Sequence, residues 1–232
     1  MFGSEATGGQ SGTVPDGGAT ETDAQPADPC APTPGAAAPR HIDEVVPFLN
    51  AMPKPVELGC FLRHFPGQMD LAASISRISA QPAFSKRSPR IFIFSDPLIL
   101  SVVPEGMGKD LLEMSELRDD GRSLKAELAF PVTEELAPDA PYTHALYTPM
   151  GTTCAFCHAQ EERDPTIGFA AAFVSVPLRP PTLSLVSVDS LRAEASTCDA
   201  STEAFRCEML DAIFSRPTVN QRTFPESFSR FE

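Results

Sequence analysis

Alternation of hydrophobic and polar residues predicts a set of β-strands in the middle of the chain. The clearest signal covers two runs rich in β-branched and aromatic residues, 90–94 and 98–103, separated by Ser95-Asp96-Pro97. Asp-Pro favours a turn, because proline fixes its φ angle and cannot donate a hydrogen bond to a neighbouring strand. The pattern therefore predicts two strands joined by a tight connection.

A second strand pair is predicted over 110–117 and 122–132, joined by the polar turn RDDG. In the second of these strands the apolar positions alternate, which predicts one buried face; they are Leu124, Ala126, Leu128 and Phe130. Alternation also predicts a strand over 69–78, and a long apolar run predicts a buried strand over 167–178.

Helical signals lie at the two ends of the folded part. Residues 41–52 predict a short helix that Pro47 shortens, and 186–197 predict a helix capped by Ser187 or Asp189. A last helix is expected over 201–215, with apolar residues recurring on one face and Pro217 after it. The segments 138–151 and 223–231 are expected to be a proline-rich loop and an aromatic tail that docks on the domain.

Strands first and helices late predict an α+β fold, in which an antiparallel β-sheet precedes two C-terminal helices. Residues 1–40 consist mainly of Gly, Ala, Pro, Thr, Ser and acidic residues, which predicts a disordered linker ahead of a single domain over 41–232. This leader resembles the tether after the lipidated cysteine of bacterial lipoproteins. Met1 would then stand where a lipid anchor was attached; the alternative is a low-complexity cytosolic tail.

Charge and hydropathy exclude several classes of partner. The formal net charge is −13, which argues against nucleic acid and against anionic lipid surfaces, because both attract basic proteins. No apolar run approaches the roughly 20 residues that a transmembrane helix needs. We therefore expect no nucleic-acid partner and no transmembrane segment.

The strongest chemical signal is the segment GTTCAFCHA, in which Cys154, Cys157 and His158 form a C-x-x-C-H motif. On a short helix capped by Thr152 or Thr153, positions i, i+3 and i+4 share one face. Two thiols placed in this way can each join one haem vinyl group, while the histidine ligates the iron. The motif therefore predicts one covalent haem c on a haem-attachment helix.

Three other interpretations of the motif remain open. A structural zinc site would need a fourth ligand, for which His144 is available nearby. A thioredoxin-type redox pair would be expected earlier in the chain, after a first strand. The cluster could also be purely structural.

The remaining cysteines indicate an exported protein. Cys30, Cys60, Cys198 and Cys207 allow three pairings. The closeness of Cys198 and Cys207 favours that pair, which leaves Cys30 with Cys60. Stable disulfides and haem attachment both belong outside the cytoplasm, so we expect a periplasmic or outer-membrane-tethered protein.

The motif resembles that of c-type cytochromes, and this resemblance implies electron transfer with redox partner proteins. The late position of the motif in the chain is similar to its position in the β-sheet cytochromes, which are the cytochrome c′-beta group and its hydroxylamine-oxidising relatives. Lys125 matches, by position only, the lysine that cross-links haem in the hydroxylamine-oxidising relatives. The second axial ligand stays open; the candidates are Met107, Met114, Met209, His64, His144 or none. Met150 lies too close to His158 in the chain to reach the opposite face of the ring.

Three functions follow as hypotheses. The first is an exported monohaem cytochrome that carries electrons and is not itself an enzyme. The second is a haem-based gas binder or sensor with an open sixth position. The third is a non-haem structural or interaction protein of the cell envelope.

Overall fold

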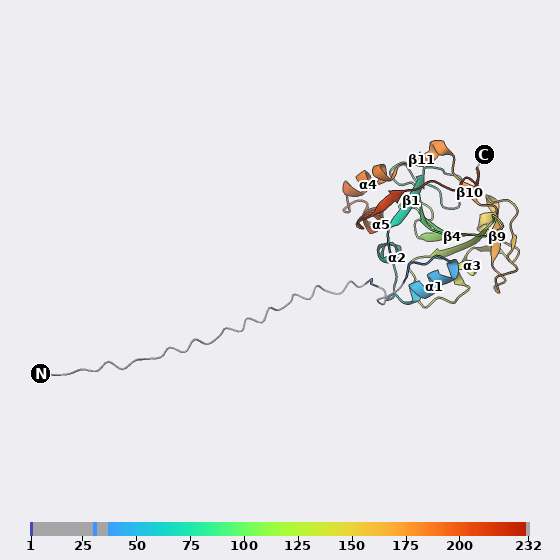
Figure 1. Cartoon of the computed structure of the whole chain (residues 1–232), viewed down its shortest axis with the longest axis horizontal. Coiled ribbons are helices and arrows are strands. Elements are labelled where there is room, and N and C mark those ends of the chain that lie inside the picture. Colours follow the sequence, from blue (N-terminus) through green and yellow to red (C-terminus); the bar gives the residue numbers. More distant parts are fainter. Residues whose placement is uncertain (2–29, 32–36, 231–232) are drawn as a thin grey trace.

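The computed structural model describes residue 1, residues 30–31 and residues 37–230, so most of the predicted linker 1–40 lies outside the described residues. The fold is mixed α+β, built on a large, mostly antiparallel sheet (Figure 1). This confirms the predicted fold class. Two helices precede the sheet, however, whereas helices were expected mainly after it.

The main sheet has nine strands in the order β11-β1-β2-β3-β4-β5-β9-β8, with β12 pairing in parallel beside β1. Its members are β1 (Met69–Ser74), β2 (Arg90–Ser95), β3 (Leu98–Val102), β4 (Leu111–Leu117), β5 (Ser123–Ala129), β8 (Glu162–Arg163), β9 (Phe173–Ser175), β11 (Leu185–Val186) and β12 (Val219–Gln221). The four consecutive strands β2 to β5 form an antiparallel meander, as their sequence patterns predict.

Helices and smaller sheets complete the fold. The α-helices are α1 (Ile42–Asn50), α2 (Leu58–His64), α3 (Ala140–His144), α4 (Val188–Ser196) and α5 (Ala204–Phe214), with 3-10 turns η1 (Thr153–Phe156) and η2 (Thr182–Ser184). Two strand pairs lie apart from the main sheet: β6 (Leu146–Thr148) with β7 (Gly151–Thr152), and β10 (Leu178–Arg179) with β13 (Ser229–Arg230). Ser187 caps α4, as one of the two predicted caps.

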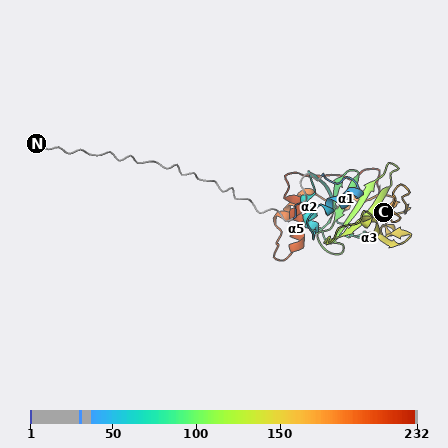
Figure 2. The same ribbon diagram turned by 90° about the horizontal axis from the view of Figure 1, so that it is seen from below.

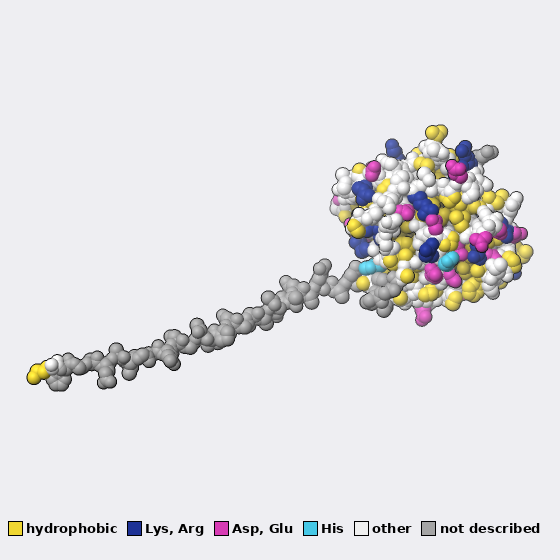
Figure 3. Space-filling model, in the orientation of Figure 1, with side chains coloured by type: hydrophobic (Ala, Val, Ile, Leu, Met, Phe, Trp, Pro, Cys, Tyr) yellow, Lys and Arg dark blue, Asp and Glu magenta, His cyan; other side chains and the backbone are white. Residues whose placement is uncertain are grey.

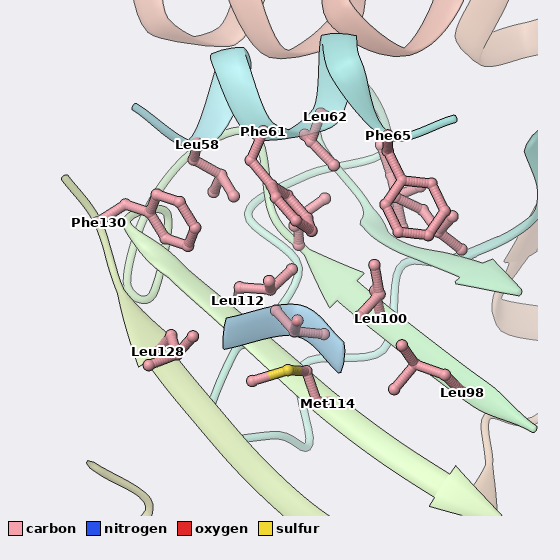
Figure 4. Packing of buried hydrophobic residues seen from close by; sticks show 14 of the residues in the cluster. Leu58, Phe61, Leu62, Phe65, Leu98, Leu100, Leu112, Met114, Leu128 and Phe130 are labelled. Carbon is pink, nitrogen blue, oxygen red and sulfur yellow. The ribbon is translucent and has the colours of Figure 1, made fainter. Parts of the chain in front are cut away.

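One face of the sheet carries the main hydrophobic core. Apolar side chains of α2, among them Phe61, point onto Leu100 of β3 and Leu112 of β4 (Figure 4). Helices α2 and α5 pack side by side in both views (Figures 1 and 2). The alternation of β2 to β5 therefore directs one set of side chains into this core, and burial of that apolar surface drives the packing.

The opposite face is covered by the chain's last segment. Phe224 packs edge-on against Phe92 and Phe94, with ring centroids 4.9 and 5.5 Å apart, and Phe228 lies beside it. Phe224 and Phe228 are both buried. The predicted docking of the aromatic tail is confirmed for these two residues, while Phe231 lies outside the described residues.

Four local predictions are wrong. The helix α1 continues past Pro47 to Asn50 instead of being cut short by it. The apolar run 167–178 forms a strand only at β9, and the predicted loop 138–151 contains α3 and the β6–β7 hairpin. In β5 the polar residues Lys125 and Glu127 are buried together with the apolar ones, so both faces of this strand are covered.

Two disulfides join the pairs that the sequence favours, Cys30–Cys60 and Cys198–Cys207, with Cα atoms 5.4 and 5.5 Å apart. On the face seen in Figure 3, basic and acidic side chains are interspersed, with hydrophobic side chains between them. The acidic balance of the chain therefore does not gather into a single negative patch on this face. Among the described residues, no helix has the length and apolar character to cross a membrane.

Candidate functional site

The C-x-x-C-H motif lies against a pocket on the second face of the sheet. Cys154, Cys157 and His158 form one wall of this pocket. The opposite wall, called here the sheet wall, consists of side chains from β2, β3, β4 and β5: Arg90, Phe92, Ile99, Ser101, Glu113, Ser115 and Lys125. Phe224 and Phe228 of the C-terminal segment close another side. The pocket encloses about 1070 Å³ that atoms do not fill, part of it open to solvent.

A compact turn positions the two thiols. The predicted short helix is a 3-10 turn, η1, that follows directly on the β6–β7 hairpin. The amide of Cys154 donates to the Thr152 hydroxyl at 3.1 Å, and the amides of Cys157 and His158 both donate to the Cys154 carbonyl, at 3.1 and 2.9 Å. Thr152 is thus the N-cap, as one of the two predicted caps, and these bonds fix the spacing of the three motif residues.

Glu161 holds the capping residue in place. Its carboxylate accepts hydrogen bonds from the Thr152 amide, at 2.7 Å, and from the Thr152 hydroxyl. Thr152 itself is 2 % exposed, so its polar atoms depend on these partners. Glu161, which follows the motif in the sequence, therefore stabilises the turn by its hydrogen bonds to Thr152. The sequence pattern did not indicate this role.

Replacing Thr152 with valine should lower the free energy of unfolding by about 1 kcal/mol, since valine keeps the shape but removes the cap and one bond to Glu161. Urea unfolding of the two proteins measures the difference. Thr153→Val is the matched control, because the Thr153 hydroxyl does not cap the turn. Equal losses in the two variants would contradict the capping role.

His158 is oriented as a metal ligand needs to be. Its Nδ1 lies 2.8 Å from the carbonyl oxygen of Val176, a bond in which the ring nitrogen donates. This leaves Nε2 as the atom with a free lone pair, and a backbone partner of this kind commonly fixes ligating histidines. Burial, and next the positive charge of Lys125, lowers the pKa of His158 to about 3, so the ring is neutral at physiological pH.

The two motif cysteines are free thiols. Burial raises the pKa of Cys154 to about 11, whereas thioredoxin-type cysteines have a lowered pKa and react as thiolates. Among the described residues, the ligand atoms of Cys154, Cys157 and His158 do not gather in one cluster of the size that a single ion would need.

The sheet wall is polar, which sequence reasoning missed. The Arg90 guanidinium pairs with Glu113 and donates to Ser101 Oγ at 2.8 Å, while Lys125 Nζ lies 3.4 Å from Ser115 Oγ. Burial lowers the pKa of Lys125 to about 8 and raises that of Glu113 above its usual range. Within the described part of the chain, Glu113 Oε1 has no hydrogen-bond partner. The signal that could have found part of this wall is the alternation itself, since polar residues recur at every second position in β4, at Glu113 and Ser115, and in β5, at Ser123, Lys125 and Glu127.

Of the five residues suggested as second axial ligands, only Met114 is among the residues that line the pocket. Met114 and Met209 are core residues at 3 % and 1 % exposure, and the Met114 side chain packs on the helix-covered face (Figure 4). Met107 is 75 % exposed, and neither it nor His64, at the end of α2, lines the pocket. His144 pairs with Glu127 at 2.9 Å, also away from the pocket. Lys125, the residue matched only by position, does line it.

The His144–Glu127 pair should make stability depend weakly on pH. The hydrogen bond that the protonated His144 ring donates to the Glu127 carboxylate raises the pKa of His144 above 6.5, so the stabilising contribution is complete below about pH 6.5 and is lost as pH rises through the folded value. We expect a fraction of a kcal/mol, because the His144 side chain is 40 % exposed. Urea unfolding at about pH 5.5 and pH 8.5 should show a smaller change for His144→Gln than for the wild type. Identical changes would mean that the pair is not formed in solution.

Comparisons of this chain with models of protein families, with curated proteins and with solved structures find no match. What the pocket can bind must therefore be inferred from its own residues.

Proposed function

We propose that the protein is a monohaem c-type cytochrome that holds one haem c in the pocket. Cys154 and Cys157 would form the two thioether bonds, and His158 Nε2 would ligate the iron. The observation that carries the proposal is that all three residues line one pocket, with Nδ1 of His158 engaged by Val176.

The chain's own residues would supply the surroundings of the haem. Bound haem supplies reversible one-electron chemistry at its iron. The neutral His158 ring is ready to ligate without first losing a proton. The rings of Phe92, Phe224 and Phe228 would exclude water from one side of the site, which tunes the reduction potential. An exported carrier that exchanges electrons with redox partner proteins fits these features, and the two disulfides support the export.

One observation favours a second candidate, a haem protein that binds a small ligand at an open sixth position. The sheet wall presents Arg90, Glu113 and Lys125, whereas of the five predicted methionine and histidine ligands only Met114 lines the pocket, and its side chain packs in the core. Polar groups at this place can hydrogen-bond a diatomic or similarly small molecule. A lysine could also ligate iron directly, in which case the sixth position would be filled.

The test is the absorption spectrum of the full chain produced together with a cytochrome c maturation system. Haem that stays with the protein through acid–acetone extraction supports covalent attachment. Binding of carbon monoxide by the reduced form would favour the open site, and failure to bind would favour a six-coordinate electron carrier. A colourless protein would contradict both and leave a non-haem role in the cell envelope.

A further inference from the structure

The pocket concentrates positive charge in an acidic protein. Its lining carries three basic side chains, Arg90, Lys125 and Arg179, against one carboxylate, Glu113. With His158 neutral, three positive charges and one negative charge leave an excess of two, although the chain as a whole has a net charge of −13. An occupant with acidic groups would be attracted to such a lining.

The three basic side chains differ in how many hydrogen-bond and ion-pair partners they have. Arg90 donates to Glu113, Ser101 and Ser79, so its charge and its hydrogen bonds are already used. Lys125 has only a long contact with a serine hydroxyl. Within the described chain, Arg179 forms no ion pair, and its Nε is buried without a hydrogen-bond partner. A buried polar atom without a hydrogen-bond partner is unfavourable, so an acidic ligand that reached this guanidinium would gain by pairing with it.

The backbone presents Arg179 firmly. It belongs to β10, which pairs in parallel with β13, and Pro177 and Pro180 flank this strand and also line the pocket. The same segment begins at Val176, whose carbonyl holds the His158 ring. One short stretch of chain therefore holds the imidazole of His158, through the Val176 carbonyl, and carries the guanidinium of Arg179. A ring bound by His158 would have its edge within the same pocket as Arg179.

We propose that Arg179 is the carboxylate anchor of the pocket and binds a propionate group of the haem. This inference rests on the function proposed above. A guanidinium can form two parallel hydrogen bonds to one carboxylate, which fixes orientation as well as adding affinity. The two thioether bonds would fix the ring at its periphery, and His158 would fix it at the iron. Arg179 would then fix the edge that carries the acidic groups.

Metal-free porphyrins test this role without relying on iron. The full chain, produced without the maturation system, is titrated with protoporphyrin IX and with its dimethyl ester, in which both carboxylates are blocked. The wild type should bind the diacid about tenfold more tightly than the ester, the size expected for a charge-assisted hydrogen bond. Arg179→Gln should lose this preference while binding the ester as the wild type does, which also shows that the variant is folded.

Arg163→Gln is the matched control, because Arg163 lies outside the pocket and its removal changes the net charge equally. It should keep the preference for the diacid. The role of Arg179 as the carboxylate anchor would be contradicted if the wild type bound the two porphyrins with equal affinity, or if Arg179→Gln kept the preference for the diacid. Neither result would contradict the proposal that the pocket binds haem. Failure of the wild type to bind either porphyrin would instead contradict the proposed function, and with it the role of Arg179 that depends on that function.

Discussion

A chain in which Cys154 and Cys157 are both replaced by alanine is expected to lose all covalently attached haem. Both thioether bonds of the proposed cofactor would come from these two thiols, and the described cysteines outside the pocket are joined in disulfides. His158 remains in the variant, so haem could still bind reversibly. Acid–acetone extraction of matured protein measures the difference: haem should leave the variant and stay with the wild type.

The control for this experiment removes two cysteines at another place. Cys198→Ala combined with Cys207→Ala breaks a disulfide between helices α4 and α5 that is not part of the pocket lining. This variant should be less stable but should retain covalent haem. Haem that resists extraction from the Cys154/Cys157 variant, or that leaves only the control, would contradict the assignment of the motif.

Replacing Arg206 with methionine is expected to lower the free energy of unfolding by about 3 kcal/mol. Arg206 is 1 % exposed, and its guanidinium donates to Glu194 and Glu203, both at 2.8 Å. It also donates to Ser88 Oγ and to the Arg87 carbonyl, at 2.9 and 3.0 Å, so one side chain ties α4, α5 and the segment before β2 together. Methionine fills much of the volume but removes the buried partner of Glu194 and Glu203, which keep only the more exposed Arg87, and it removes the donor to Ser88 Oγ and the Arg87 carbonyl.

The surface pair Arg63–Asp211 provides the comparison. It also joins two elements, α2 and α5, but its side chains are 36 % and 59 % exposed. Arg63→Met should therefore change the stability by less than about 1 kcal/mol. Denaturant unfolding of both variants measures the contrast, and similar losses would show that burial does not control the contribution of these ion pairs.

The sequence predicts the centre of this fold well because its signals there are local. Alternation and turn residues specify β2 to β5, and each of these strands pairs with its neighbour along the chain. The segment 167–178 was misjudged because an apolar run does not by itself distinguish a strand from a buried turn. Likewise α3 is short and contains Pro141, so periodicity could not reveal it.

The candidate site was predicted only in part for a similar reason. The motif Cys154, Cys157 and His158 is contiguous and therefore visible in the sequence. The sheet wall opposite it combines single residues of four strands, such as Arg90 and Lys125, which only the register of the sheet brings together. No sequence pattern distinguishes Arg179, which only the folded chain, with β10 paired to β13, places in the pocket lining.

The placement of Phe224 and Phe228 has a consequence for how the protein is made. The pocket takes residues from Ser74 in β1 through to Phe228, so its walls span most of the folded chain in order of synthesis. A nascent chain that has not yet released residue 228 can form the β2–β5 meander but cannot close the site over Phe92. The pocket can therefore close only when the segment that carries Phe224 and Phe228 is available to fold, which makes it one of the last features of the fold to be completed.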